Sequence, residues 1–543
     1  MISDDALSRR QFVVASAATA LAACTRQSSA PSTSGSPGPQ ANPPPASGNA
    51  RSNSMTPEQV SLTDLSAVQA IAHMKAGDLS AERYAEALLA QCKAKSELNA
   101  FISFDADRVR EGAREADRRR AANAPLGLMH GLPIPIKDSL NTRDYPTTAG
   151  TPALRHFKPK DNAPLVETLV RAGAIVLGKT NLHELSYGWT SNNLAFGAVH
   201  NPYDVTRIPG GSSGGTAAAI AARMAPLGVA EDTEGSIRVP AAFCGIVGFR
   251  PTTGRYSTAG AVPISSLFDQ AGPHARSVSD IALFDDVARA DTRAPDPRPL
   301  TARSLSGVKI AVCRAFWFEG LDPEVERISA GALQKLKDAG AQIIETEMPE
   351  LAGLIERTTD QVQNHDVRLQ LPVYLQTYGA GVTFDELVAQ ASADIRDTFA
   401  HDVLPGGAGF VSEQVYKDAV NIYLPRLRRM YREFFVRTGA AAIVFPATRV
   451  TAPRIGDEGD LIVGNQKVRF DLAVARNIGP GSTASIPGLV IPAGLAANGL
   501  PVAIEFDAPA GADRALLELG LGVERVLGPL CLTCRPDNQR RNL

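Results

Sequence analysis

The sequence is poor in cysteine and almost without net charge, and it contains no visible internal repeat. Six cysteines in 543 residues do not make a disulfide framework. A formal net charge of −2, with no obvious basic patch, gives no sign of a nucleic-acid partner. Hydrophobic residues at 44% and charged residues at 21% are typical of a soluble globular protein long enough for a large core. A disulfide-stapled scaffold and a polyanion binder are therefore excluded as first interpretations.

The first 24 residues resemble an export signal. The segment SRRQF at 8–12 is similar to a twin-arginine motif, and the apolar run at 12–23 is too short for an ordinary membrane span. The run ends in LAAC, similar to a bacterial lipoprotein cleavage box, in which Cys24 would become the lipidated first residue. We predict export of the folded protein to the periplasm, with a possible membrane anchor at Cys24. A cleaved signal with an incidental cysteine and a weak N-terminal helix are the alternatives.

Two further segments follow this signal. Residues 25–57 are rich in Ser, Pro, Gly and Ala, a composition that cannot bury a core and indicates a flexible tether. Residues 58–535 carry the remaining periodic pattern and are predicted to form one globular domain. The sequence therefore predicts a signal at 1–24, a disordered linker at 25–57 and a single folded body.

The folded body alternates helical patterns with short apolar runs. Apolar residues recur at three- and four-residue spacing over 62–120, which predicts helix, and 323–437 is also mainly helical. An Ala-rich helix is expected at 217–223. Strands or strand-like apolar runs are expected at 174–177, 225–229, 308–312, 441–445 and 488–492. This interleaving predicts an α/β fold with a mostly parallel or mixed sheet.

Several familiar motifs occur in contexts that do not suit their chemistry. Residues 173–180 fit the P-loop pattern, but the residues between its glycines form an apolar strand rather than a phosphate-cradling turn. Residues 211–215 fit a nucleophile elbow, yet the last histidine, His401, lies far from the end where such an enzyme would need it. The zincin-like His183-Glu184 lacks its second histidine, because Tyr187 occupies that position. None of these three interpretations is adopted.

Two shorter patterns are equally weak. Residues 306–309 fit S-x-x-K, but Lys309 alternates with apolar neighbours in an expected strand and should face outward. Cys531 and Cys534 form a lone C-x-x-C, which is poor support for a metal site, although a local disulfide is possible in an oxidising compartment.

Three polar positions are better candidates for catalytic residues than the motifs above. Ser212 lies in PGGSSGG, a glycine-rich loop that runs directly into a helix and so lies near an N-terminus that favours negative charge. Ser236 follows an apolar stretch at the end of the turn 232–236, whose N–H groups can form an oxyanion hole. No histidine accompanies them, so Lys137, which follows the apolar LPIPI, is the candidate base. The alternatives are a packing turn and a salt-bridged lysine.

The chain resembles the amidase signature family of Ser–cis-Ser–Lys hydrolases. The resemblance covers roughly residues 58–530. The segments that carry it are PIPIKD at 133–138, AGAIVLGKTNLHE at 172–184, PGGSSGGTAAAIAA at 209–222, GSIRVPAAFCGIVGFRPT at 235–252 and GLPVAIEF at 499–506. The resemblance implies a single α/β/α domain around a large mixed sheet, and neither metal nor organic cofactor.

The resemblance also implies roles for individual residues. Ser236 would be the nucleophile, Ser212 would adopt a cis peptide and relay the proton, and Lys137 would be the base. The backbone at Thr233, Glu234, Gly235 and Ser236 would form the oxyanion hole. Glu234 departs from the family pattern, which usually has Gly there. It could point away, pair with a cation, hold a proton, or restrict or contact the substrate.

The implied activity is hydrolysis of a linear amide to an acid and ammonia or an amine. Segments 251–273 and 499–520 look closest to bacterial mandelamide and indoleacetamide hydrolases, which suggests small aryl or aliphatic amides. Action on anilides or carbamates is an alternative. Two other classes are a glutaminase subunit of a tRNA-dependent amidotransferase and an inactive tethered binding protein. The oligomeric state, monomer or homodimer, is left open, and 323–437 and 450–485 are expected to line the cleft.

Overall fold

The computed structural model describes residues 61–289 and 300–530. The predicted signal at 1–24, the linker at 25–57 and the pair Cys531 and Cys534 lie outside the described residues. Everything below refers to the described part of the chain.

An 11-stranded mixed sheet forms the centre of the fold. Its strands are, in spatial order, β1 (Phe101–Phe104), β3 (Ile175–Thr180), β2 (Pro133–Lys137), β6 (Leu227–Asp232), β8 (Gln270–Ala275), β7 (Val247–Arg250), β14 (Gly488–Leu495), β15 (Pro501–Asp507), β11 (Ala442–Pro446), β9 (Lys309–Val312) and β10 (Gln342–Glu345). β3, β2 and β6 run parallel to one another, as do β11, β9 and β10, and the remaining neighbours are antiparallel. Two small hairpins lie outside this sheet: β4 (Asn192–Asn193) with β5 (Gly197–Ala198), and β12 (Leu461–Val463) with β13 (Gln466–Val468).

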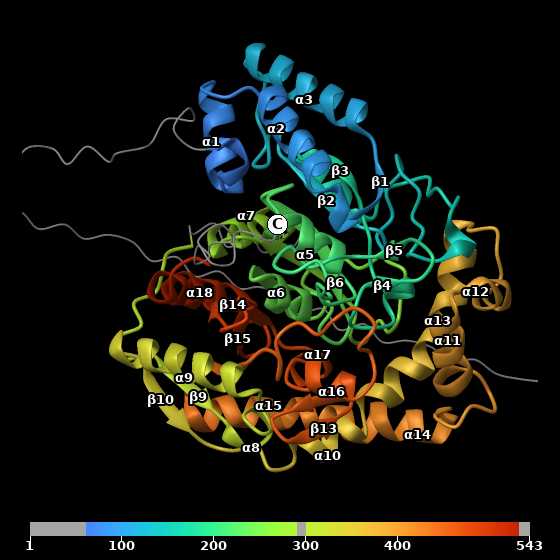
Figure 1. Cartoon of the computed structure of the whole chain (residues 1–543), viewed down its shortest axis with the longest axis vertical. Helices are drawn as coiled ribbons and strands as arrows, with labels where there is room; N and C mark the ends of the chain where they lie inside the picture. The colour runs from blue at the N-terminus through green and yellow to red at the C-terminus, as the bar shows by residue number, and fades with distance from the viewer. Residues whose placement is uncertain (1–60, 290–299, 531–543) are drawn as a thin grey trace, which may run out of the picture. The chain divides into compact units, whose positions relative to one another are not determined.

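Helices surround the sheet (Figure 1). They are α1 (Ala67–Ala76), α2 (Ala81–Ala94), α3 (Ala106–Ala121), α4 (Pro164–Arg171), α5 (Gly214–Ala221), α6 (Arg238–Cys244), α7 (Val278–Ala288), α8 (Arg314–Trp317), α9 (Pro323–Asp338), α10 (Leu351–Glu356), α11 (Thr359–Tyr378), α12 (Phe384–Gln390), α13 (Ala393–Thr398), α14 (Glu413–Asp418), α15 (Leu424–Thr438), α16 (Phe470–Val474), α17 (Gly479–Thr483) and α18 (Asp513–Leu527).

Two adjacent residues of β14 show that helices cover both faces of the sheet. Gly488 is closely approached by Arg238 of α6, whereas the next residue, Leu489, contacts Gly520 of α18. Successive side chains of a strand point to opposite faces, so α6 and α18 pack on opposite sides. The predicted α/β/α arrangement is confirmed. α5 lies beside α6, and both are drawn in green near the middle of Figure 1.

The expected elements are present, with two interruptions. The strands predicted near 174–177, 225–229, 308–312, 441–445 and 488–492 correspond to β3, β6, β9, β11 and β14. The helical prediction over 62–120 is wrong at β1, where Phe101–Phe104 pair antiparallel with β3. Similarly, 323–437 is mainly helical, as predicted, but β10 and several loops interrupt it. In both places a four-residue strand is too short to disturb the helical period of its surroundings, and only its sheet partner defines it.

The sheet ends in two short strands. β1 and β10 have four residues each and pair on one side only, and β1 also carries a register shift between Phe101 and Ser103. Gln342 and Glu345, the terminal residues of β10, are exposed. Both open sides of the sheet therefore present few backbone groups.

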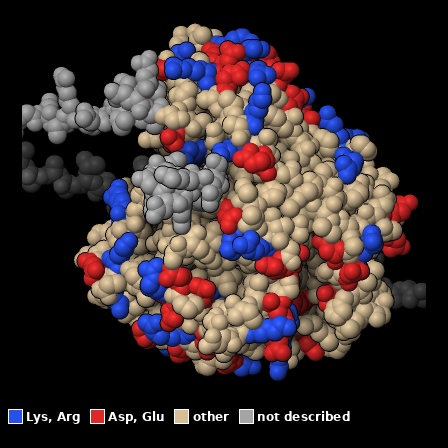
Figure 2. All heavy atoms as spheres, viewed as in Figure 1, with Lys and Arg blue, Asp and Glu red and all other residues tan. Residues whose placement is uncertain are grey.

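Charged groups of both signs are mixed on the surface. On the face seen in Figure 2, acidic and basic groups intersperse, including at the end formed by α3, where arginines such as Arg114 and Arg118 pair with glutamates. This mixture agrees with the small net charge. Within the described residues, no helix combines the length and apolar character needed to cross a bilayer.

Candidate active site

Lys137 is the last residue of β2 and is fully buried. Its Nζ donates to Ser212 Oγ at 2.6 Å and lies 2.9 Å from Glu231 Oε2 on the adjacent strand β6. Burial lowers the pKa of Lys137, although the Glu231 carboxylate acts in the opposite direction. The structure therefore brings Lys137 and Ser212 together as the sequence predicts, and it adds Glu231.

Ser212 is held by its backbone in the loop that precedes α5. The Gly211–Ser212 peptide bond is cis, and the Ser212 carbonyl accepts hydrogen bonds from His183 N at 3.1 Å and Ser191 Oγ at 3.1 Å. Glycine is required here for close approach, because a Cβ at Gly215 would lie 2.3 Å from the carbonyl oxygen of Asn181. These contacts fix the hydroxyl of Ser212 against Lys137.

The turn that carries Ser236 is held by Asp232 at the end of β6. One Asp232 oxygen accepts from Gly235 N at 2.7 Å and the other from Ile237 N at 3.0 Å. Burial favours the neutral acid, but Arg238 and Arg250 together lower the pKa of Asp232, so it remains a carboxylate. Asp232 therefore shapes the turn through its charge.

The same hydrogen bonds bear on the predicted oxyanion hole. The N–H of Gly235 is already bound to Asp232. Within the described residues, the N–H groups of Thr233, Glu234 and Ser236 have no acceptor and so stay available for a developing negative charge. The useful donors of the turn are thus those on either side of Gly235.

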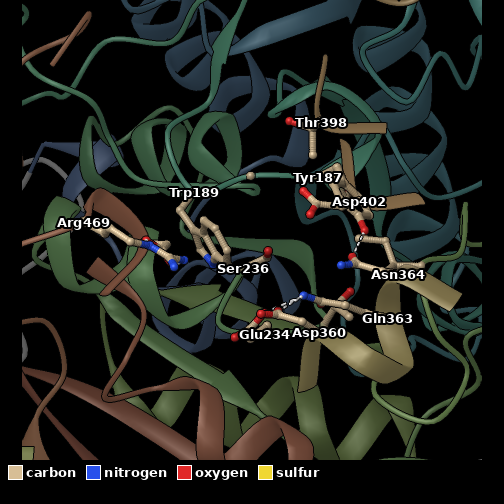
Figure 3. A pocket seen from close by; sticks show the side chains of 15 residues that line it. Tyr187, Trp189, Glu234, Ser236, Asp360, Gln363, Asn364, Thr398, Asp402 and Arg469 are labelled. Atoms are coloured by element: carbon tan, nitrogen blue, oxygen red, sulfur yellow. Dashed lines mark hydrogen bonds and ion pairs between the residues drawn. The ribbon is translucent and has the colours of Figure 1, made fainter. Parts of the chain in front are cut away.

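Ser236 opens into a pocket of about 270 Å³ (Figure 3). The Ser236 carbonyl accepts from Ser213 N at 3.3 Å, which holds this turn against the Ser212 loop. The pocket combines aromatic and apolar side chains with acidic and amide groups; its lining includes Tyr187, Trp189, Ile264, Glu234, Asp360, Gln363, Asn364, Asp402, Arg469 and Asp471. No hydrogen bond joins the hydroxyls of Ser212 and Ser236 among the described residues.

Glu234 lines this pocket and pairs with an amide rather than a cation. Gln363 on α11 donates from Nε2 to Glu234 Oε2 at 3.0 Å and to Asp360 Oδ1 at 2.9 Å. Burial and the nearby Asp360 charge raise the pKa of Glu234 well above its usual value. Arg238, its closest basic neighbour in sequence, instead binds Asp232 and Glu505. Glu234 therefore presents a carboxyl group that tends to hold its proton beside Ser236.

Both segments that were expected to line the cleft contribute side chains to the pocket beside Ser236. Residues 323–437 supply Asp360, Gln363, Asn364, Thr398 and Asp402, and 450–485 supplies Arg469 and Asp471. No motif marks these individual positions, because they come from helices and loops without a recognisable sequence pattern.

The rejected motifs have structural roles. Lys179, in the P-loop-like segment, lies in β3. Its side chain is buried, and its Nζ lies 2.9 Å from a carboxylate oxygen of Asp138. Lys309 is exposed on β9. The described residues contain no group of three or more His, Cys, Asp or Glu side chains that could hold a metal ion. His183 Nε2 lies 3.8 Å from Asp394, and its Nδ1 lies 3.0 Å from Thr190 Oγ1.

Comparison with known proteins places this geometry in context. A family model described as Amidase matches residues 83–517. The chain is 34% identical to an indoleacetamide hydrolase of Allorhizobium ampelinum over 86% of this chain and 99% of that one, and 36% identical to a mandelamide hydrolase of Pseudomonas putida over 86% and 92%. A solved amidase structure superposes with a TM-score of 0.76 at 28% identity, covering 86% of this chain and all of that one.

Proposed function

The chain belongs to the amidase family and hydrolyses amides to an acid and ammonia through a serine acyl-enzyme; from this premise we propose that Ser236 is its nucleophile. In this proposal neutral Lys137 accepts a proton through Ser212 while Ser236 Oγ attacks the amide carbonyl. The N–H groups around Ser236 stabilise the tetrahedral oxyanion. The relay then protonates the leaving nitrogen, and water hydrolyses the acyl-enzyme by the same route.

Three observations support these roles. Lys137 and Ser212 are in hydrogen-bonding contact at 2.6 Å. The Ser213 N–Ser236 O bond keeps the two serine loops adjacent. Ser236 opens into the pocket, where a substrate carbonyl can approach its hydroxyl.

We propose that the substrates are small primary amides with an aryl or aliphatic acyl group. The observation that carries this is the size and lining of the pocket beside Ser236: about 270 Å³, with Tyr187, Trp189 and Ile264 supplying apolar surface. A cavity of this size is near the lower end of small-molecule sites, and aromatic side chains favour flat apolar groups. Its relatives act on indoleacetamide and mandelamide by name, which agrees with this class.

A hydrolysis screen tests the substrate proposal. Ammonia release from primary aryl and aliphatic amides, and amine release from anilides, carbamates and amidated peptides, are measured with Ser236→Ala as the control. The proposal predicts the highest kcat/KM for small primary amides and loss of all turnover in the control. Higher kcat/KM for anilides or carbamates would instead establish the aryl acylamidase or urethanase alternative.

We also propose that residues 1–24 direct export and that Cys24 carries a lipid. The support is the order of the sequence signals: the arginine pair, a short apolar run and then LAAC. Metabolic labelling with a radioactive fatty acid should mark the wild-type chain and not Cys24→Ala, with fractionation showing the wild-type chain in the envelope. Equal labelling of both chains would rule out the anchor at Cys24.

A further inference from the structure

Glu231 contacts Lys137 more closely than any other charged side chain in the described structure. Lys137 Nζ lies 2.9 Å from Glu231 Oε2 and 3.3 Å from the Glu231 main-chain oxygen. The side chains of Lys137 and Glu231 are 0% and 2% exposed. A base must be neutral to accept a proton, whereas a buried carboxylate beside it favours the charged form. The proposed mechanism does not yet account for this pair.

The surroundings of Nζ match a protonated amine at rest. Three acceptors surround it: Ser212 Oγ, Glu231 Oε2 and the Glu231 carbonyl. An ammonium group has three N–H bonds and no lone pair. Before Lys137 can accept the proton of Ser212, one of these N–H bonds must break.

We infer that Glu231 takes up the proton that Lys137 must lose to become a base. One N–H bond of Lys137 breaks, its electron pair stays on Nζ, and an O–H bond forms at Glu231 Oε2. The pair holds one proton before and after this step, so the buried site does not change its net charge. Nζ then faces Ser212 with a lone pair. The inference rests on the role of Lys137 in the proposed function and makes Glu231 a positioning residue.

A chain of hydrogen bonds on the far side of Glu231 supports its resting charge. Thr233 Oγ1 lies 3.1 Å from Glu231 Oε1 and 2.7 Å from Asp269 Oδ1. The threonine hydroxyl has one hydrogen, which it shares between these two carboxyl oxygens. Burial and the charge of Glu231 raise the pKa of Asp269 to about 7. The Thr233 hydroxyl therefore donates toward Glu231 and stabilises negative charge on its carboxyl group.

The other titratable groups near the pair do not supply a competing proton acceptor. Asp232, on the same strand, is bound by Arg238 and Arg250. Burial lowers the pKa of His183 and of His274 to about 4, so both are neutral and weakly basic. Ser186 donates to Glu231 Oε2 at 3.2 Å and carries no charge.

The pH dependence of nucleophile reactivity separates this inference from a purely structural role. The rate of Ser236 labelling by a fluorophosphonate is measured over about pH 5–10 for wild type and Glu231→Gln. In the wild-type protein the proton stays within the Lys137–Glu231 pair. The rate of Ser236 labelling should therefore fall only below about pH 6, in the range where a carboxyl group takes up a proton. This fall in rate at low pH is the acid limb of the profile. Glutamine cannot accept the proton, so Lys137 must lose it to solvent. The acid limb should then move upward by at least about one pH unit, with reactivity recovering at high pH.

The opposite outcomes overturn the inference. If Glu231 merely stabilises charged Lys137, its removal lowers the pKa of Lys137 and the limb moves downward. The inference is also refuted if the acid limb of Glu231→Gln lies at the same pH as that of wild type. It is refuted as well if folded Glu231→Gln does not regain its rate of Ser236 labelling at high pH. Should Glu231→Gln fail to fold, the wild-type profile decides alone, since a limb above about pH 8 contradicts proton sharing.

A matched control is offered by the neighbouring buried pair. Asp138→Asn removes a carboxylate from Lys179, 2.9 Å away and equally buried, and should leave the limb where it is. Lys137→Ala keeps the two proposals apart. Retained labelling in that variant would defeat the proposed function itself. Lost labelling, together with an unmoved Glu231→Gln limb, would defeat only the inference about Glu231.

Discussion

Replacing Asp232 by asparagine should destabilise the protein and disorder the turn that carries Ser236. The carboxylate accepts hydrogen bonds from two backbone N–H groups and pairs with Arg238 at 3.1 Å and Arg250 at 3.3 Å. All three side chains are fully buried. Asparagine keeps the shape but loses the charge, which removes the counter-ion of Arg250 and leaves Arg238 paired with Glu505 alone.

The expected cost is large on the scale of protein stability. Removing one partner of a buried ion pair costs about 3–5 kcal/mol, against a typical total of about 5–15 kcal/mol. Urea denaturation should show this as a lower free energy of unfolding, and kcat/KM should fall because the N–H groups beside Ser236 lose their fixed geometry. Asp107→Asn, which alters a side chain that is 93% exposed, is the control and should change neither.

The pH dependence has a definite sign. The folded-state pKa of Asp232 is below its unfolded value, so its stabilisation is present above about pH 4 and is lost as the pH falls. The difference between wild type and Asp232→Asn should therefore shrink in acid. An Asp232→Asn free energy of unfolding within about 1 kcal/mol of wild type at neutral pH would refute the reasoning.

Three further predictions concern neighbouring groups. Ser212→Ala should lower kcat by about a hundredfold or more because it removes the contact to Lys137, whereas Ser213→Ala, which loses only a bond to the Glu231 carbonyl, should have a much smaller effect; equal losses would contradict the relay. Glu234→Gly should change the ratio of kcat/KM between amides with a polar substituent and matched apolar amides by about tenfold, and an unchanged ratio would place Glu234 outside substrate selection. Phe243→Ala should cost about 3–5 kcal/mol in urea denaturation because this side chain is fully buried, and a loss below about 1 kcal/mol would contradict close packing there.

Local sequence was enough to predict that Lys137 is buried. Its strand is wholly apolar until the lysine, so burial and a lowered pKa follow from five residues of context. Likewise, the glycine content around Ser212 indicates a loop where backbone must approach closely, and Gly215 does so. The α/β class with its mixed sheet followed from the alternation of apolar runs and helical periods, whereas the α/β/α layering followed from the family resemblance.

Long-range pairing was not predictable in the same way. Glu231 lies 94 residues from Lys137, and the pair exists only because β2 and β6 are neighbours in the sheet. The partner of Glu234 is Gln363, 129 residues away on α11. No periodicity in a single sequence specifies which strands or helices meet, so these electrostatic environments emerge only in the folded chain.

The short outer strands of the sheet bear on how this chain behaves among copies of itself. A sheet of 11 strands could extend from molecule to molecule by pairing backbone groups at its open sides, the route that leads to domain swapping and fibres. β1 and β10 offer four residues each, one with an irregular register and the other with exposed Gln342 and Glu345. Edge-to-edge association through β1 and β10 is therefore disfavoured.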